Sequence, residues 1–156
     1  CRCGQYGCLE TLVSEPTLLR EAQLLVDKYP TSILAANLSR SETKPIDALF
    51  EAVRSGDQRA FEMIEEQMHY QGIALVNLVN ILNPEQIILG GMFAEGSDLI
   101  LPKVEATIRK LAFAGLGENV IVQPTGFGWR AGVIGAASLA LKEFFYEMSR
   151  ESTLSY

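Results

Sequence analysis

The chain has 156 residues, of which 48% are hydrophobic, so the composition is that of one compact domain with a core of its own. Thirteen basic and nineteen acidic residues give a net charge of −6 and a pI near 4.8. A surface this acidic repels phosphate backbones, which argues against direct binding of DNA or RNA by this chain.

The chain opens with CRCGQYGCLE, which contains all three of its cysteines. Residues two apart in an extended segment point to the same side, so Cys1 and Cys3 can face one ion. Gly4 and Gly7 permit the sharp turn that brings Cys8 back to meet them. The spacing therefore predicts a metal site with three thiolate ligands.

An odd number of cysteines argues against a closed disulfide framework. Structural zinc prefers four ligands, so we expect one more, a histidine, upstream of Cys1, in a longer protein of which this chain is a part. Two alternatives remain open. The only histidine of the chain, His69, could be the fourth ligand, or the three thiols could be free or incidentally oxidised.

Helices dominate the first half of the chain. Residues 14–30 predict a helix that Ser14 caps, because apolar residues recur there at helical spacing. Residues 31–45 are rich in Ser, Thr and Asn and are predicted to form a loop. A second helix is expected over residues 46–55, and a long one over residues 57–82, whose apolar second half should be buried.

Two short apolar runs predict buried strands. Pro84 ends the long helix, because its ring disfavours helical geometry in the preceding residue. The run QIILGG, residues 86–91, predicts a buried parallel strand that enters a tight turn at Gly90 and Gly91. NVIVQP, residues 119–124, predicts a second buried strand.

Two further helices are expected at residues 97–113 and 131–148. Pro102 is compatible with the first of them only if it lies in the first turn. The small residues Gly132 and Gly135 should let the last helix pack closely against a sheet. Helices that alternate with buried strands predict an α/β layer architecture.

The most apolar stretch, residues 72–91, is not predicted to enter a membrane. It contains three asparagines and a proline, and lipid would leave their polar groups unsatisfied. The first residues carry neither a basic region nor an apolar run, so no signal peptide is indicated and a cytoplasmic protein is expected.

The opening run resembles the signature of the ROK family, C-x-C-G-x-x-G-C-x-E, at every fixed position. This family contains bacterial sugar kinases and sugar-responsive repressors. The segments NLVNILNPEQIILGG and AGVIGAASLAL are also similar to the family. The resemblance implies an α/β chain that is the C-terminal part of an actin/hexokinase-like (ribonuclease H-like) two-lobed fold. Residues 1–156 would be the C-terminal lobe of a sugar-binding and oligomerisation domain, with the N-terminal lobe and any DNA-binding domain absent.

The resemblance also implies roles for residues of the opening run. Cys1, Cys3 and Cys8, with an upstream histidine, would bind a structural zinc ion. Glu10 would contact a sugar hydroxyl, and an ionised carboxylate can accept strong charge-assisted hydrogen bonds from such groups. From the residues alone, the preferred interpretation of Glu10 is an acidic residue at a helix start, where the helix dipole favours it.

The glycine pair Gly90 and Gly91 lies where the kinases of the family place their nucleotide, although such a pair is also common in ordinary tight turns. Kinases often have a third glycine at the position of Met92. Trp129 and Arg130 stand where smaller or acidic residues are expected. Both departures count against ATP, which is expected as a ligand only if the protein is a kinase.

The run GCLETLVS is similar to repressors of glucose and N-acetylglucosamine metabolism, and Arg2 stands where kinases more often have glycine. We therefore predict the effector-binding part of a transcriptional repressor. The alternative is the C-terminal lobe of an ATP-dependent hexose kinase, and no catalytic residue is expected in this chain. The expected partners are a sugar or sugar-phosphate effector, operator DNA bound through a separate N-terminal domain, a transport protein as in some relatives, and further copies in a homodimer or homotetramer.

Overall fold

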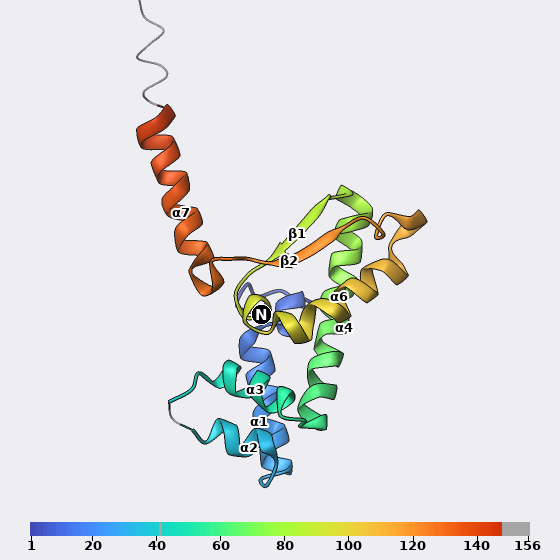
Figure 1. The fold of residues 1–156 in the computed structure, drawn as a ribbon, viewed down its shortest axis with the longest axis vertical. Helices are drawn as coiled ribbons and strands as arrows, with labels where there is room; N and C mark the ends of the chain where they lie inside the picture. The colour runs from blue at the N-terminus through green and yellow to red at the C-terminus, as the bar shows by residue number, and fades with distance from the viewer. Residues whose placement is uncertain (41, 148–156) are drawn as a thin grey trace, which may run out of the picture.

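The computed structural model describes residues 1–40 and 42–147 (Figure 1). A helical body is joined to a small parallel sheet, and one helix stands apart from both (Figure 1). The elements in chain order are η1 (Leu9–Thr11), α1 (Glu15–Lys28), α2 (Ile33–Leu38), α3 (Pro45–Arg54), α4 (Gln58–Leu82), β1 (Gln86–Leu89), α5 (Met92–Glu95), α6 (Ser97–Leu111), η2 (Phe113–Gly115), β2 (Ile121–Pro124), η3 (Gly128–Arg130), α7 (Ala131–Leu141) and η4 (Lys142–Glu147).

The long helix α4 runs through the body and contacts α1, α3 and α6 (Figure 1). Its N-cap, Asp57, is buried and accepts a hydrogen bond from the backbone N–H of Ala60 at 3.1 Å. The other oxygen of the same carboxylate accepts from the N–H of Leu34 in α2, at 2.9 Å. One side chain thus starts α4 as predicted and also attaches α2 to it.

Two glycines set how closely the helices approach. A Cβ on Gly72 of α4 would lie 2.7 Å from Cγ2 of Thr107 in α6. A Cβ on Gly96, just before α6, would lie 2.6 Å from the ring of Phe50, which is fully buried in α3. Any larger residue at either position would push the helices apart.

The sheet consists of β1 and β2, which pair in parallel from Gln86 with Ile121 to Leu89 with Pro124. The predicted parallel pairing is confirmed. The predicted full burial is wrong, because helices of this chain cover one face only: Leu89 is 7% exposed, whereas Ile88 on the opposite face is 59% exposed.

Two further predictions fail within the body. The expected loop at residues 31–45 contains α2, because Ser32 caps a helix by accepting from the N–H of Ala35 at 3.1 Å. Pro102 lies inside α6, beyond its first turn, and the helix continues through it. Ile100 and Val104 on either side of the proline are fully buried, so packing compensates for the lost backbone hydrogen bond.

An ion pair also joins α3 to α6. The guanidinium group of Arg54 donates to both carboxylate oxygens of Asp98, at 2.9 and 2.6 Å, and to the backbone carbonyl of Glu95 at 3.3 Å. These hydrogen bonds lower the pKa of Asp98 and raise that of Arg54. Since both side chains are about half exposed, the pair fixes the geometry of the contact more than it adds stability.

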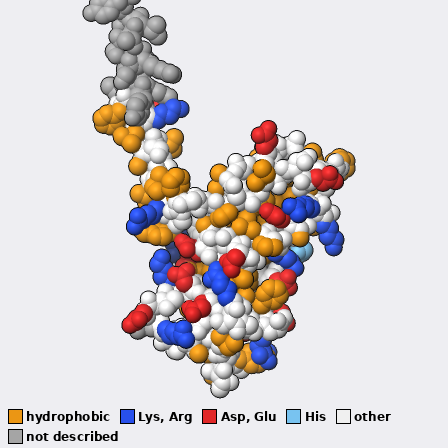
Figure 2. All heavy atoms as spheres, in the orientation of Figure 1, with side chains coloured by type: hydrophobic (Ala, Val, Ile, Leu, Met, Phe, Trp, Pro, Cys, Tyr) orange, Lys and Arg blue, Asp and Glu red, His pale blue; other side chains and the backbone are white. Residues whose placement is uncertain are grey.

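The C-terminal helix does not pack as predicted. None of the residues of α7 is buried, and Val133 and Leu139 are each 70% exposed. Figure 2 shows hydrophobic side chains along the visible side of this helix, while charged side chains of both signs are mixed on the body. The end of α4, predicted to be buried, is likewise exposed at Ile81 and Leu82.

No helix within residues 1–40 and 42–147 combines the length and the apolar character that crossing a membrane requires.

The contact between α4 and α6 yields a stability prediction. Gly72→Ala should lower the free energy of unfolding by about 1–3 kcal/mol, although alanine favours a helix more than glycine does, because the new methyl group overlaps Thr107. Denaturant unfolding followed by circular dichroism measures this change. A variant as stable as the original chain would mean that the two helices separate without cost.

Candidate metal centre

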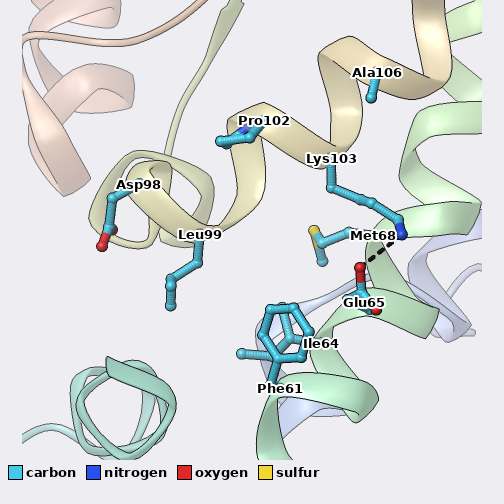
Figure 3. Close-up of a pocket in the computed structure, with 9 residues that line it drawn as sticks. All are labelled: Phe61, Ile64, Glu65, Met68, Asp98, Leu99, Pro102, Lys103 and Ala106. Atoms are coloured by element: carbon cyan, nitrogen blue, oxygen red, sulfur yellow. Dashed lines mark hydrogen bonds and ion pairs between the residues drawn. The ribbon is translucent and has the colours of Figure 1, made fainter. Parts of the chain in front are cut away.

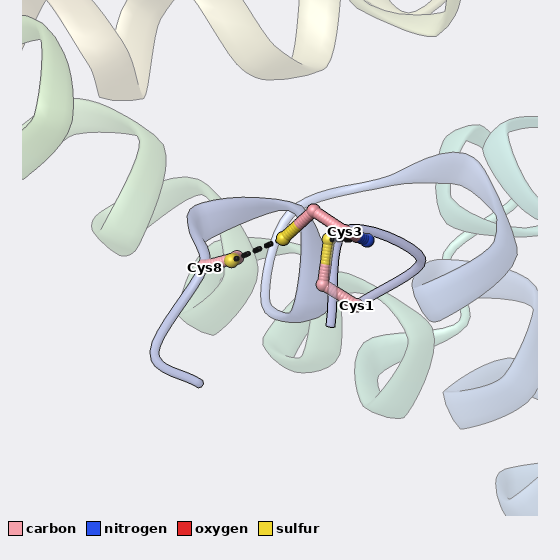
Figure 4. Close-up of side chains that lie close together, drawn as sticks. All are labelled: Cys1, Cys3 and Cys8. Atoms are coloured by element: carbon pink, nitrogen blue, oxygen red, sulfur yellow. Dashed lines mark hydrogen bonds between the residues drawn. The ribbon is translucent and has the colours of Figure 1, made fainter. Parts of the chain in front are cut away.

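The three cysteines of the opening run meet in space (Figure 4). The Sγ atoms of Cys1, Cys3 and Cys8 all lie within 4.8 Å of one another. Gly4 and Gly7 have φ values of +79° and +74°, a conformation that glycine adopts without strain. The predicted turn is therefore present, and it brings the predicted ligands together.

The chemistry of the cluster suits a soft divalent ion. The Sγ atoms of Cys3 and Cys8 are 3.4 Å apart. Hydrogen bonds from the backbone at Gln5 and from the thiol of Cys8 lower the pKa of Cys3, which favours the thiolate that binds metals. Three convergent sulfur donors fit zinc, which takes thiolate ligands in tetrahedral sites. The arrangement leaves one ligand position to be filled.

His69 does not belong to this cluster. It lies in α4 and lines a hollow of about 300 Å³ with side chains of α6, among them Lys103 and Lys110. Within the described residues, the candidate metal group consists of the three cysteines alone. The geometry therefore gives no support to His69 as the fourth ligand.

Glu10 lies on η1, the short turn that follows the cluster directly, and this turn is held at both ends. The carbonyl of Cys8 accepts from the hydroxyl of Thr11 at 2.6 Å and from its N–H at 3.0 Å. The carbonyl of Glu10 accepts from the hydroxyl of Thr17 at 3.3 Å, and the Thr17 hydroxyl lies 3.0 Å from that of Ser14, the N-cap of α1. The position of Glu10 thus depends on both the cysteine loop and the start of α1.

The Glu10 side chain faces the cluster and a small polar hollow. Its Oε2 accepts a hydrogen bond from the thiol of Cys1, with a sulfur–oxygen distance of 3.5 Å. The hollow measures about 280 Å³. Its lining consists of Cys1, Arg2, Glu10, Thr11, Ser14, Pro16, Thr17 and Arg20. A carboxylate, hydroxyl groups and two guanidinium groups therefore surround one space.

Sequence reasoning did not assign Arg20 or Thr17 to this site. The sequence did contain a signal that these two side chains belong together. Thr17 and Arg20 are three residues apart in the helix that begins just after the cysteine run, and residues at this spacing share one helix face. Arg20 also pairs with Glu21 at 3.0 Å, so its charge is partly balanced.

The glycine pair lies at the end of β1. Gly91 has φ of +60° and precedes the short helix α5. The N–H of Thr125, which follows β2, donates to the carbonyl of Leu89 at 2.8 Å, so the turns after both strands lie side by side. This edge of a parallel sheet is a common ligand position. Met92, the first residue of α5, is however buried.

Aromatic and cationic side chains lie on the turn after β2. The ring of Trp129 is 63% exposed. Lys44 Nζ lies 5.7 Å from the centre of this ring, and the guanidinium carbon of Arg130 lies 5.2 Å from it. Trp129 and Arg130, one of the two departures from the kinase pattern, thus form a cation–π cluster with Lys44.

A separate hollow of about 380 Å³ lies between α4 and α6 (Figure 3). Its walls are mostly apolar, with Phe61, Met68 and Leu99 among them, and Lys103 donates to Glu65 across it at 2.7 Å. None of the predicted site residues lines this hollow.

A sequence profile of the ROK family matches residues 1–143. The chain is 30% identical over 137 residues to the DNA-binding transcriptional repressor Mlc of Escherichia coli, covering 88% of this chain and 32% of Mlc. It is 29% identical over 143 residues to a glucokinase of Halalkalibacterium halodurans, covering 92% of this chain and 43% of that protein. The chain therefore spans a third to less than half of the length of these relatives.

The fold is similar to that of a ROK family glucokinase from Streptomyces griseus, solved in complex with glucose and AMPPNP. The TM-score is 0.74 at 27% identity, and the match covers 89% of this chain and 46% of that one. This likeness confirms the fold class predicted from the sequence, an α/β fold of the actin/hexokinase-like type.

The cysteine cluster predicts a metal requirement that can be measured. Cys3→Ser in the full-length protein should abolish stoichiometric zinc binding, because two thiolates cannot hold zinc as tightly as three. Elemental analysis after purification without chelators gives the metal content. Tyr6→Ala is the matched control, since Tyr6 lies in the same loop, fully exposed, and offers no ligand to the ion. Equal zinc content in Cys3→Ser and the wild type would rule out the site.

Proposed function

The chain belongs to the ROK family, and from this premise we propose that it is the effector-binding and oligomerisation part of a sugar-responsive transcriptional repressor of the cytoplasm. The observation that supports this proposal is the position of Glu10, which lies on a fixed turn beside three convergent thiols and faces a polar hollow. A carboxylate in such a place is suited to binding hydroxyl groups.

A structural zinc ion fits the three cysteines and would supply a rigid crosslink, without taking part in any reaction. Cys8 would then hold the turn through its carbonyl, to which Thr11 donates twice. Thr17 holds the turn from the side of α1. Glu10 is in this way positioned before any effector arrives, which lowers the entropy cost of binding.

The effector is a sugar or a sugar phosphate. Glu10 accepts hydrogen bonds from sugar hydroxyls, and the hydroxyl groups of Thr11 and Ser14 line the same hollow. Arg2 and Arg20 also line it and offer cationic donors that suit an anionic group on the ligand.

Operator DNA is bound by a separate N-terminal domain, since this chain has a net charge of −6. Effector binding favours one arrangement of lobes or protomers in a homodimer or homotetramer, and this arrangement sets the spacing of the DNA-binding domains. In a variant of this scheme, a transport protein takes the place of the sugar as the signal.

A sugar kinase is the second candidate, favoured by the similarity to a glucokinase that was solved with glucose and AMPPNP. In a kinase, the turn at Gly90 and Gly91 would approach the nucleotide. Two features favour the repressor instead. Met92 occupies a buried position directly after the glycines, and Trp129, on the adjacent turn, contacts the cationic side chains of Lys44 and Arg130.

We also propose that residues 1–156 form the C-terminal lobe of a two-lobed domain, with α7 covered by the other lobe. An α-helix that is apolar on every side is normally buried, yet α7 has no buried residue in this chain. The face of the sheet that carries Ile88 and Ile121 is also exposed, and we expect the other lobe to bury it as well.

The effector site is tested by Glu10→Gln in the full-length protein. Isothermal titration with a panel of hexoses and hexose phosphates should find a ligand for the wild type, with affinity reduced about tenfold or more in the variant, because a charge-assisted hydrogen bond is lost. Glu15→Gln is the matched control, since Glu15 is exposed and does not line the hollow. No binding of any saccharide to the wild type would contradict the proposal.

Assays on the full-length protein also distinguish a repressor from a kinase. A repressor should bind operator DNA in a sugar-dependent manner and produce no ADP with ATP and any hexose. Hexose-dependent ADP production, followed by a coupled assay, would establish the kinase alternative.

If the other lobe buries α7, one substitution in this helix should affect stability differently in the chain 1–156 and in the full-length protein. Leu139→Asp should not change the unfolding of the chain 1–156, where Leu139 is 70% exposed. In the full-length protein it should cost about 2 kcal/mol or more, because the charge becomes buried. Leu24→Asp on α1, exposed to 57%, should be tolerated in both. Equal unfolding of the two full-length variants would show that α7 stays exposed.

A further inference from the structure

The three thiols of the cluster are not equivalent (Figure 4). The Sγ atoms of Cys3 and Cys8 form the close pair, 3.4 Å apart. The thiol of Cys1 instead donates to the carboxylate of Glu10, at 3.5 Å, and accepts from the backbone N–H of Cys3, at 3.5 Å. One pair of sulfurs is thus placed for direct reaction, while the third is engaged elsewhere.

The backbone between the paired thiols can adjust to a covalent bond. Gly4 and Gly7 lie between them, both have positive φ, and no atom lies within 4 Å of where a Cβ would be on either. A disulfide requires the sulfurs to approach to about 2 Å. Since nothing packs on these two glycines, the loop can close over this distance without disturbing the core.

The two sulfurs also differ in access to solvent. Cys3 is exposed, and Cys8 is half-buried. A small oxidant arriving from solvent therefore meets Cys3 first, and Cys8 is the thiol within reach of the product.

We propose that Cys3 and Cys8 are a peroxide-sensitive pair whose oxidation to a disulfide dismantles the metal centre. The Cys3 thiolate attacks one oxygen of hydrogen peroxide, the O–O bond breaks, hydroxide leaves, and Cys3 becomes a sulfenic acid. The Cys8 thiolate then attacks the Cys3 sulfur, the S–O bond breaks, and a second hydroxide leaves. The two thiolates lose two electrons, and the peroxide is reduced by the same two.

The disulfide removes two of the three thiolate ligands at once, so zinc is released. Its effect reaches Glu10 through Cys8, whose carbonyl anchors the turn that carries the carboxylate. The pair therefore makes effector binding dependent on oxidation. This last consequence rests on the proposed function, whereas the disulfide itself does not.

Peptide mapping of the full-length protein after treatment with hydrogen peroxide tests the pair directly. Trypsin cleaves after Arg2 and Arg20, so Cys3 and Cys8 fall in one peptide and Cys1 in another. The expected result is a peptide 3–20 that has lost the mass of two hydrogens and no longer reacts with iodoacetamide. A chelating dye should detect zinc release in step with this loss, and a dithiol reductant should reverse it.

Two variants distinguish this pair from other pairings. Cys1→Ser should still form the disulfide within peptide 3–20, whereas Cys8→Ser should leave Cys3 as a sulfenic acid. A crosslink between Cys1 and peptide 3–20, or zinc retained on a chain whose peptide 3–20 is oxidised, would overturn the proposal. A disulfide in a protein that binds no sugar would support the pair and contradict the proposed effector function.

Discussion

The close packing of α4 on its neighbours is the constraint on which the rest of the molecule depends. α4 contacts α1, α3, α6 and the turn η1, and it leads directly into β1. Gly72 allows the close approach of α6, and Asp57 attaches α2 at the other end. α1, which begins beside the polar hollow at Glu10, and β1, which ends in the glycine turn, are thus both held by α4.

The cysteine cluster and the polar hollow at Glu10 are connected by short backbone contacts rather than by a long pathway. The cysteine loop ends in Cys8, whose carbonyl holds Thr11, and Glu10 is held from the other side by Thr17. Any change in the loop therefore reaches the carboxylate over a few bonds. A loop this exposed has little packing of its own, so a crosslink by a metal would give it the stiffness that burial provides elsewhere.

Much of the fold follows from local signals in the sequence. Ser14 caps α1 as predicted, the long helix begins where it was predicted to begin, and the β-branched run before Gly90 forms a parallel strand. Prediction failed where tertiary contacts decide. α2 depends on the carboxylate of Asp57, which is distant in the sequence. α6 continues through Pro102 because the neighbouring side chains are buried. Of the site, spacing and glycines predicted the convergence of the cysteines, whereas the position of Arg20 at the same hollow as Glu10 was not predicted.

The core of this chain is continuous in sequence, since its members lie between Val13 and Val122 and none comes from α7. During translation, all of these residues leave the ribosome before residues 131–141 do. The body can therefore fold while its last helix is still inside the exit tunnel. Among the described helices, the apolar α7 therefore emerges only after every residue of that core.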